Sequence, residues 1–252
     1  MTRVIPAVVL LTFCLTLPAR ADEVTLIAPG GIRAAIEKLI PGFERTTGHK
    51  VKATFGSGGG TKQQVVRGEP FDVPIVQPPY PDVLSSGHVV VSSETPLATV
   101  AVGVAVRTGA PKPDISTPDA VRRMLLAATF ISYPDGSRGA AAGVSFDATL
   151  KALGISEQMK PKIKIAQGGA GAMALLAKGE IDIGVTFISE IITEPGVEVV
   201  GPLPREISTP TSLVGFVSAQ AKAPEAARAL LRYLSSPEAA AIYRAAGMTP
   251  GK

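Results

Sequence analysis

The sequence predicts an α/β protein, and three observations carry that prediction. Short apolar strands alternate with Gly-rich turns and amphipathic helical stretches along most of the chain. The 252 residues are 46% hydrophobic and 18% charged, enough to build one large domain or two lobes of roughly 100 residues each. The apolar, β-branched run at 97–106 contains no helical pattern and suits a strand that crosses between two lobes. This composition excludes a disordered chain, a collagen-like repeat and a disulfide framework.

The first half of the chain repeats the order strand, tight loop, helix. Gly-rich turns at 29–31 and 56–61 separate the strands from the helices that follow them. Consecutive strands joined by helices require right-handed crossovers, so parallel β-α-β packing is expected. The expected strands are 24–28, 51–55 and 72–76, and the expected helices are 32–45, 62–67 and one closed by Gly87 and His88.

The same order resumes after the crossing run. Thr117 and Pro118 are typical of the cap and first position of a helix. A strand at 212–218 is expected to return the chain to the first lobe. The other expected elements are strands 129–132, 163–166 and 181–187, a Gly-rich loop 134–143 that enters a helix, and helices 172–178, 223–234 and 237–246.

Residues 1–21 have the features of a secretory signal peptide. Arg3 gives a positive start, 8–17 is apolar, and Ala19-Arg20-Ala21 is a small-x-small cleavage site. The apolar run is shorter than the roughly 20 residues that a membrane span needs. Cys14 follows the bulky Phe13, which argues against lipid attachment. We therefore expect a periplasmic protein that is not inserted in a membrane after cleavage.

The chain after cleavage excludes several classes of function. It has 23 basic and 21 acidic residues, so its net charge is +2, and no run of Lys and Arg is interleaved with aromatic residues. Nucleic-acid binding therefore has little support. Cysteine is absent and His49 and His88 are the two imidazoles, so neither a zinc site nor a cysteine nucleophile is expected, and we expect no metal.

Four short loops rich in Gly or Ser follow predicted strands, at 29–31, 56–61, 135–139 and 168–171. In an open α/β sheet such loops converge on the ligand crevice, and helix N-termini there hold small anions. Each glycine alone is explained by a tight turn. Four such loops, spread over both lobes, favour a shared anion pocket.

A nucleotide-phosphate loop is the natural alternative for 56–62. Its order is Thr61 followed by Lys62, whereas a Walker loop has Gly-Lys followed by Ser or Thr. The segment also lacks a G-x-G-x-x-G frame with a suitably placed acidic residue. We expect no cofactor.

Four segments carry a resemblance to a known family: Val24-Thr25-Leu26-Ile27-Ala28, Phe55-Gly56-Ser57-Gly58, Gly68-Glu69-Pro70-Phe71-Asp72-Val73 and Lys178-Gly179-Glu180-Ile181-Asp182-Ile183-Gly184. Over 22–250 the chain resembles type II periplasmic solute-binding proteins, in the molybdate-binding-protein-like branch. The resemblance implies two α/β lobes joined by crossing segments, with the ligand in the interlobe cleft. Lobe I is expected at 22–102 plus 206–252, and lobe II at 103–205.

The resemblance also implies partners. The expected function is capture of a small anionic ligand for an ABC permease by a monomeric protein. The same branch contains aconitate isomerase-like enzymes, which shift a double bond by proton transfer without a cofactor, and these are the alternative. Molybdate or another oxyanion is a further alternative ligand.

The family's pocket, carried over to this chain, predicts the ligand-binding residues. They are Pro29, Gly30, Gly31, Ser57, Gly58, Gly59, Thr61, Ser137, Arg138, Gly139, Gly169 and Phe187.

Two positions depart from the oxyanion-binding pattern. Phe187 stands where molybdate-binding proteins have a tyrosine hydroxyl, and Arg138 adds a guanidinium that matches a planar carboxylate. An organic carboxylate is therefore favoured over molybdate, although an exposed loop position would explain Arg138 equally well. For an isomerase, Lys62 and Arg138 would supply cations, and Lys62 or Glu190 the base. Otherwise Asp72 and Glu190 are expected to be structural.

Overall fold

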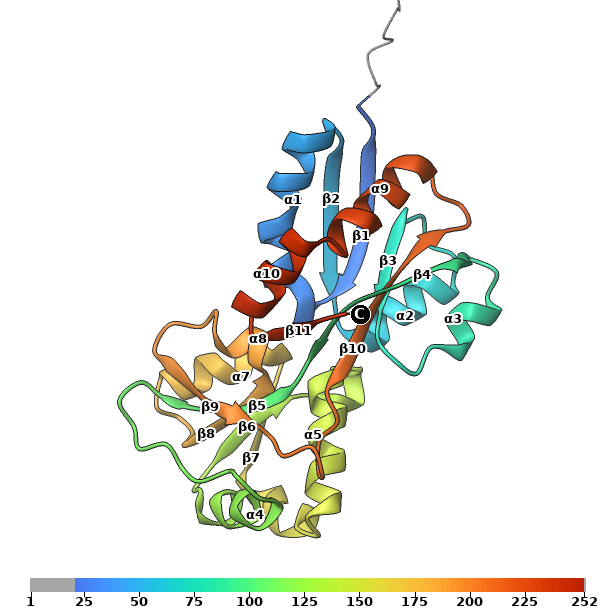
Figure 1. Ribbon diagram of the computed structural model, residues 1–252. Coiled ribbons are helices and arrows are strands. Elements are labelled where there is room, and N and C mark those ends of the chain that lie inside the picture. The colour runs from blue at the N-terminus through green and yellow to red at the C-terminus, as the bar shows by residue number, and fades with distance from the viewer. Residues whose placement is uncertain (1–20, 252) are drawn as a thin grey trace, which may run out of the picture.

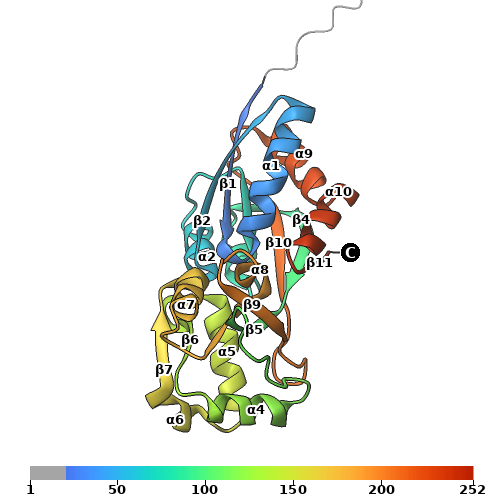
Figure 2. The ribbon, with the colours of Figure 1, turned by 90° about the vertical axis from the view of Figure 1, so that its left-hand side faces the viewer.

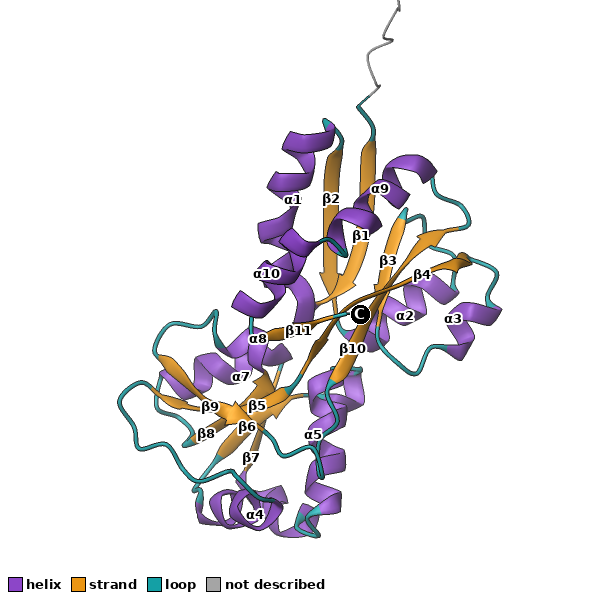
Figure 3. Ribbon diagram, viewed as in Figure 1, coloured by secondary structure: helices purple, strands orange, loops and turns teal. Residues whose placement is uncertain are grey.

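The computed structural model describes residues 21–251, which form two lobes, each built on its own β-sheet (Figure 1 and Figure 3). Lobe I contains a six-stranded sheet, and lobe II a five-stranded sheet. The predicted two-lobed α/β fold is confirmed. Cys14 and nearly all of the predicted signal peptide lie outside the described residues.

The sheet of lobe I has the strand order β11-β4-β10-β3-β1-β2. The bounds are β1 Glu23–Pro29, β2 Lys50–Gly56, β3 Val73–Val76, β4 Val89–Val100, β10 Thr211–Ser218 and β11 Met248–Pro250. Strands β1, β2 and β3 are parallel, whereas β10 runs antiparallel to both β3 and β4. The carboxyl ends of the three parallel strands therefore open on the same edge of this sheet, the edge nearer to lobe II in Figure 1.

Helices cover both faces of this sheet because successive side chains of its strands point to opposite sides. Leu26 of β1 packs with Ile36 and Phe43 of α1, whereas the neighbouring Ile27 packs with Val65 of α2. Helices α9 and α10 join α1 on its face, and α3 joins α2. The bounds are α1 Arg33–Thr47, preceded by a 3-10 turn η1 at Gly30–Ile32, α2 Gly58–Val66, α3 Pro81–Ser85, α9 Pro224–Leu234 and α10 Pro237–Ala245.

The sheet of lobe II has the strand order β7-β6-β8-β5-β9. Val104 of β5 belongs to the cluster around Phe146 of α5, and the adjacent Ala105 to the cluster around Met173 of α7, so α5 and α7 cover opposite faces (Figure 2). The strands are β5 Val102–Arg107, β6 Ile131–Pro134, β7 Ile163–Ala166, β8 Ile183–Phe187 and β9 Val197–Pro202. The helices are α4 Pro118–Ala127, α5 Ala141–Ala152, α6 Ser156–Met159, α7 Gly168–Ala177 and α8 Ile188–Ile191, with 3-10 turns η2 Gly136–Arg138 and η3 Lys160–Lys162.

The chain crosses between the lobes within the apolar run at 97–106, where the sequence predicted a crossing. That run is not one strand: β4 ends at Val100 in the first sheet, and β5 begins at Val102 in the second. The return passes from β9 to β10, as expected for the strand at 212–218. The residue bounds given above for the two lobes stay a prediction.

Two helices begin earlier than predicted. Helices α2 and α7 begin at Gly58 and Gly168, although the sequence placed their starts at Lys62 and Ala172. Glycine has low helix propensity, so the run of glycines reads as loop in the sequence. In the structure, tertiary context overrides that propensity, and Ser57 caps α2 by accepting a hydrogen bond from the Gly60 amide at 3.1 Å.

Candidate functional site

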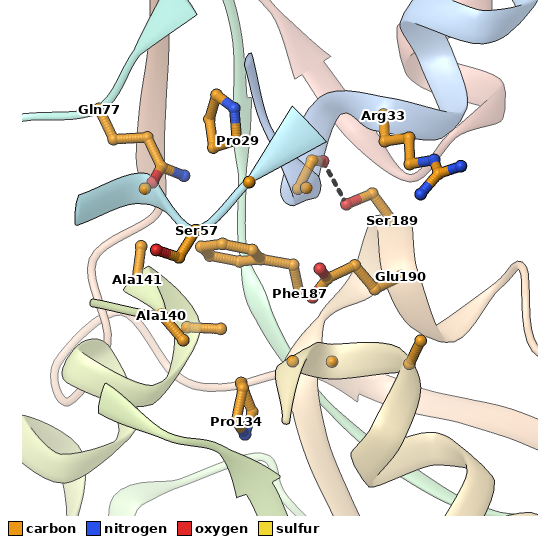
Figure 4. A pocket seen from close by; sticks show the side chains of 18 of the residues that line it. Pro29, Arg33, Ser57, Gln77, Pro134, Ala140, Ala141, Phe187, Ser189 and Glu190 are labelled. Atoms are coloured by element: carbon orange, nitrogen blue, oxygen red, sulfur yellow. Dashed lines mark hydrogen bonds between the residues drawn. The ribbon is translucent and has the colours of Figure 1, made fainter. Parts of the chain in front are cut away.

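A cleft of about 620 Å³ lies between the two lobes, at the carboxyl ends of their parallel strands. Its walls come from the loops after β1, β2 and β3 in lobe I and after β6, β7 and β8 in lobe II (Figure 4). The four Gly-rich loops that the sequence singled out all contribute lining residues. The structure thus brings together loops that are more than 100 residues apart in the chain.

Helix N-termini make up much of the cleft wall. The lining includes the starts of η1, which leads into α1, and of α2, α5 and α7. The first N–H groups of a helix lack intrahelical partners. Side chains do not satisfy them at η1, α5 or α7, whose N-cap residues Pro29, Ala140 and Gln167 make no capping hydrogen bond. These amides and the positive ends of the helix dipoles are therefore available to an anion.

The structure places the predicted site residues in two groups. Those that line the cleft are Pro29, Gly30, Gly31, Ser57, Gly58, Arg138, Gly169, Phe187 and Glu190. Those that do not line it are Gly59, Thr61, Lys62, Ser137 and Gly139.

Local hydrogen bonds explain most of the second group. Lys62 turns away from the cleft, and its Nζ donates to the carbonyl of Pro79 at 2.9 Å, so it faces α3 instead of the predicted ligand. Ser137 donates its hydroxyl to Asp135 at 2.6 Å. Thr61 belongs to the buried face of α2 and is fully buried.

Gly59 and Gly139 belong to a contact between the lobes. The amide of Gly59 donates to the carbonyl of Gly139 at 3.0 Å. A side-chain carbon on Gly59 would stand 3.1 Å from the Cα of Gly139, closer than most such contacts allow. These two glycines therefore let the backbones of the two lobes approach each other beside the cleft.

A second contact between the lobes joins the start of α8 to η1. Ser189 donates its hydroxyl to the carbonyl of Gly31 at 2.7 Å, a buried bond drawn in Figure 4. The Phe187 ring packs on the same turn, where a side-chain carbon on Gly31 would stand 2.8 Å from the ring. Phe187 is 3% exposed and gives the cleft an apolar wall without a hydroxyl donor.

Two arginines line the cleft, and they differ in their partners. The Arg33 Nε donates to Glu37 at 2.8 Å, and the guanidinium stacks over the Phe55 ring. Arg138 is exposed at the end of η2, and no described acidic side chain lies within 4 Å of its guanidinium nitrogens. Arg138 is thus the cleft-lining cation whose charge is not paired.

Glu190 brings a carboxyl group into the same cleft. Its Oε2 accepts a hydrogen bond from the Thr186 hydroxyl at 2.5 Å, and Oε1 lies toward Gly30 of lobe I. Figure 4 shows this carboxyl beside the Phe187 ring, and no described Lys, Arg or His nitrogen lies within 4 Å of it. Burial raises the pKa of Glu190 despite the hydrogen bond from Thr186. The cleft therefore holds a carboxyl that takes up a proton more readily than an exposed one.

Several lining residues were not predicted from the sequence, notably Gln77, Gln167, Arg33 and Ser189. Gln77 directly follows β3, and the position of a polar residue at the carboxyl end of a buried strand was the available signal. Gln167 likewise follows β7. Ser189 sits within α8, a helix with no signal in the sequence.

Asp72 lies away from the cleft and is structural, as predicted. Its carboxylate accepts from the amide and hydroxyl of Thr25 at 2.8 and 2.6 Å and from the amides of Lys222 and Ala223 at 2.6 and 3.3 Å. Burial opposes its ionisation, but these hydrogen bonds outweigh burial and lower the pKa of Asp72.

Two features are absent from residues 21–251. No three His, Cys, Asp or Glu side chains in that range gather in a way that would hold a metal ion. Within the same range, no helix combines the length and apolar character that crossing a membrane requires.

Comparison with known proteins places the chain among binding proteins. A family model described as bacterial extracellular solute-binding protein matches residues 24–249. An aconitate isomerase from Pseudomonas sp. is 34% identical over 233 residues, which cover 90% of this chain and 87% of that protein. The molybdate-binding protein ModA of Azotobacter vinelandii is 28% identical over 235 residues, covering 91% of this chain and 90% of that protein.

The solved structures agree on the fold. The periplasmic molybdate-binding protein of Azotobacter vinelandii superposes with a TM-score of 0.76 at 21% identity, covering 91% of this chain and all of that one. At this level of identity the likeness shows the two-lobed fold alone.

Proposed function

The chain belongs to the bacterial extracellular solute-binding proteins, in the branch that also contains molybdate-binding proteins and an aconitate isomerase, and from that premise we propose that it captures a small organic carboxylate in the cleft between its lobes. The observation that carries this proposal is the set of helix N-termini that converge on the cleft from both lobes without side-chain caps. Such termini bind anions through free amides and the helix dipole.

Three features of the cleft favour a carboxylate over a tetrahedral oxyanion. Arg138 offers an unpaired guanidinium whose two parallel donors match a planar carboxylate. Phe187 offers an apolar surface where a hydroxyl donor would serve molybdate. The cleft volume of about 620 Å³ is in the range of pockets that enclose small organic molecules.

The family and the N-terminal sequence together suggest where this binding takes place. We propose that residues 1–21 direct export and are removed, and that the mature monomer delivers its ligand to an ABC permease. Intact-mass measurement of the protein recovered from the periplasm should give a chain that begins at Asp22. A lipid-modified or uncleaved chain would contradict export by this route.

A thermal-shift panel tests the ligand class. Protein stripped of ligand is heated with acetate, succinate, citrate, trans-aconitate, sulfate or molybdate. A ligand that binds only the folded state raises the unfolding midpoint in proportion to the logarithm of its concentration above Kd. We expect at least one carboxylate to raise the midpoint more than molybdate or sulfate at equal concentration. The reverse order would favour an oxyanion, and not a carboxylate, as the ligand of the cleft.

A second candidate function is an allylic proton shift in an unsaturated carboxylate, and Glu190 is the observation that favours it. A carboxylate with a raised pKa is a stronger base than an exposed one, and Glu190 sits in the same cleft as the unpaired Arg138. In this reaction Glu190 removes a proton from carbon, the double bond moves to the adjacent position, and the proton returns at the far carbon. Arg138 stabilises the negative charge that develops on the carboxyl.

The two candidates are separated by following the ligand. Incubation of the protein with cis- or trans-aconitate, monitored by proton NMR, shows interconversion only if the protein is an isomerase. In that case Glu190→Gln should abolish turnover while binding persists. Tight binding of trans-aconitate with no turnover in wild type would leave the transport function as the sole proposal.

A further inference from the structure

We infer that Gln77 is a ligand-contacting residue that sets specificity, its side-chain amide donating a hydrogen bond through Nε2 to a ligand carboxylate held at the start of α2. Gln77 has this role only if the cleft binds a carboxylate, as proposed above. The residue follows the last position of β3 and lies in lobe I, across the cleft from Arg138 and Glu190 of lobe II.

The position of Gln77 aims its amide at the anion end of the cleft. The side chain lines the cleft yet is only 2% exposed, and Figure 4 shows it above Ser57 at the start of α2. Its amide oxygen packs so closely against Gly58 that any side chain at position 58 would collide with it. Glycine at the first position of α2 thus makes room for the Gln77 amide.

Both polar atoms of this amide lack a partner. Neither Nε2 nor Oε1 makes a hydrogen bond, although both are buried. Buried side-chain amides are nearly always hydrogen-bonded, because an unsatisfied donor or acceptor destabilises the fold. Among the described residues, the other buried unpartnered side-chain atoms are the hydroxyls of Thr61 and Ser132, and neither of these residues lines the cleft. The Gln77 amide therefore has no hydrogen-bond partner within the described part of the protein and lines the cleft in which a ligand would bind.

The surroundings indicate which atom faces the ligand. Oε1 rests at the N-terminus of α2, where the positive end of the helix dipole favours a partial negative charge. The donor Nε2 is then the atom that needs an external acceptor. Among the described residues of lobe I, the cation that lines the cleft is Arg33, which is bound to Glu37, whereas Lys62 points away and donates to Pro79. A neutral amide donor beside the positive end of the α2 dipole is the lobe I counterpart of Arg138.

This arrangement assigns one carboxylate to each lobe. The group at α2 is held by neutral donors, and the group at η2 by the Arg138 guanidinium. A ligand that engages both needs two carboxylates, so di- and tricarboxylates should bind more tightly than acetate.

Calorimetric titration of trans-aconitate into wild type and Gln77→Met tests this role, combined with the unfolding midpoint of each ligand-free protein. Methionine has a similar length and no hydrogen-bonding requirement. We expect affinity for trans-aconitate to fall at least tenfold while the ligand-free midpoint rises. If Gln77 only supported the fold, its replacement would lower the unfolding midpoint of the ligand-free protein. A ligand-contacting role and a structural role therefore shift this midpoint in opposite directions.

Ser132→Ala is the matched control, because it removes another buried unpartnered polar group that lies outside the cleft. It should leave the affinity unchanged. Gln77→Glu is the second variant, which keeps the shape but replaces the donor with a negative charge. It should weaken binding more than methionine does.

Two outcomes are distinguishable. Wild-type binding of trans-aconitate with unchanged affinity in Gln77→Met and Gln77→Glu would overturn the role of Gln77 and leave the proposed function intact. Wild type that binds molybdate but none of the carboxylates would overturn both.

Discussion

Arg138 is exposed at the edge of the cleft, with no acidic side chain within 4 Å among the described residues. A guanidinium free of internal partners is available to a ligand at little cost to the fold. Arg138→Ala should therefore weaken binding of trans-aconitate about tenfold, which corresponds to about 1.4 kcal/mol, while the unfolding midpoint stays within a degree or two. Titration calorimetry measures the affinity. Arg123→Ala, at an exposed position of α4, is the control, and equal affinities of the two variants would show that Arg138 serves only as a surface residue.

Glu190 gives the second prediction at the level of single residues. Because burial raises its pKa, the folded protein holds a proton that the unfolded chain has released, and folding stability falls as the pH rises from the ordinary carboxyl value through the raised one. Glu190→Gln removes this ionisation, so it should raise the unfolding midpoint at pH 8 relative to wild type and change it little at pH 4. Thermal unfolding at both pH values measures the effect. A lower midpoint for Glu190→Gln at pH 8 would show that the ionised carboxylate stabilises the cleft.

The glycine and serine residues of the four Gly-rich loops were predictable from the sequence, whereas Gln77, Arg33 and Ser189 were not. Ser57 and Gly58 follow a recognisable strand in a loop of unusual composition. Gln77 is followed by two prolines, and this pattern is typical of an ordinary turn. Its importance depends on the packing of α2 against β3, which brings Gly58 to its amide and leaves the amide without a partner. No local pattern in the sequence contains that information.

Asp72 links three elements and gives a prediction at their scale. One carboxylate accepts hydrogen bonds from Thr25 in β1 and from the amides of Lys222 and Ala223, which precede α9. Hydrogen bonds to a charged group contribute about 1.5–3 kcal/mol, so Asp72→Asn should lower the free energy of unfolding by about 2–3 kcal/mol. Urea denaturation at pH 7 measures this.

The pH dependence of the same variant has a definite sign. The hydrogen bonds lower the pKa of Asp72 in the folded state, so their contribution is full above the ordinary value of 3.8 and is lost as the pH falls through the lowered value. The difference between wild type and Asp72→Asn should shrink below pH 4. A difference that grows on acidification would contradict this role.

The elements themselves were predicted unevenly. Strands with apolar side chains on both faces, such as β1 and β8, stood out as apolar runs. Strand β9 is only partly buried, and β11 has three residues, so neither left a periodic signal. Both are held by pairing with distant strands, β9 with β5 and β11 with β4.

The contact between Gly59 and Gly139 gives a prediction for the whole molecule. Gly59→Ala would place a methyl group 3.1 Å from the Cα of Gly139, so the lobes would have to stand slightly apart. We expect affinity for trans-aconitate to fall several-fold, although Gly59 does not line the cleft. The unfolding midpoint should not fall, because alanine favours helix α2 by about 1 kcal/mol.

Gly171→Ala in α7 is the matched control, since a side-chain carbon there meets its neighbour at an ordinary 3.6 Å. It offers the same gain in helix propensity without touching the other lobe. If both variants bind equally well, the approach of the lobes at Gly59 does not limit binding.

The two-lobed organisation was predictable, but the relation between the lobes was not. The run at 97–106 marked a crossing, and the alternation of strands and helices on either side of it marked two α/β units. Two of the hydrogen bonds between the lobes, from Gly59 to Gly139 and from Ser189 to Gly31, connect residues 80 and 158 positions apart. Such pairs form only when both lobes have folded and packed together. No short segment of the sequence predicts them.

The position of β10 has a consequence for the order in which the molecule forms. This strand is near the end of the chain, yet it lies between β3 and β4 in the interior of the first sheet. Before residue 211 has been synthesised, β4 has no partner through which to join β1, β2 and β3, whereas all five strands of lobe II already exist. Lobe II can therefore assemble early from contiguous sequence, and lobe I must close a much longer loop, which slows its formation. The central sheet of lobe I therefore stays incomplete until the last 42 residues, which begin with β10, have been synthesised.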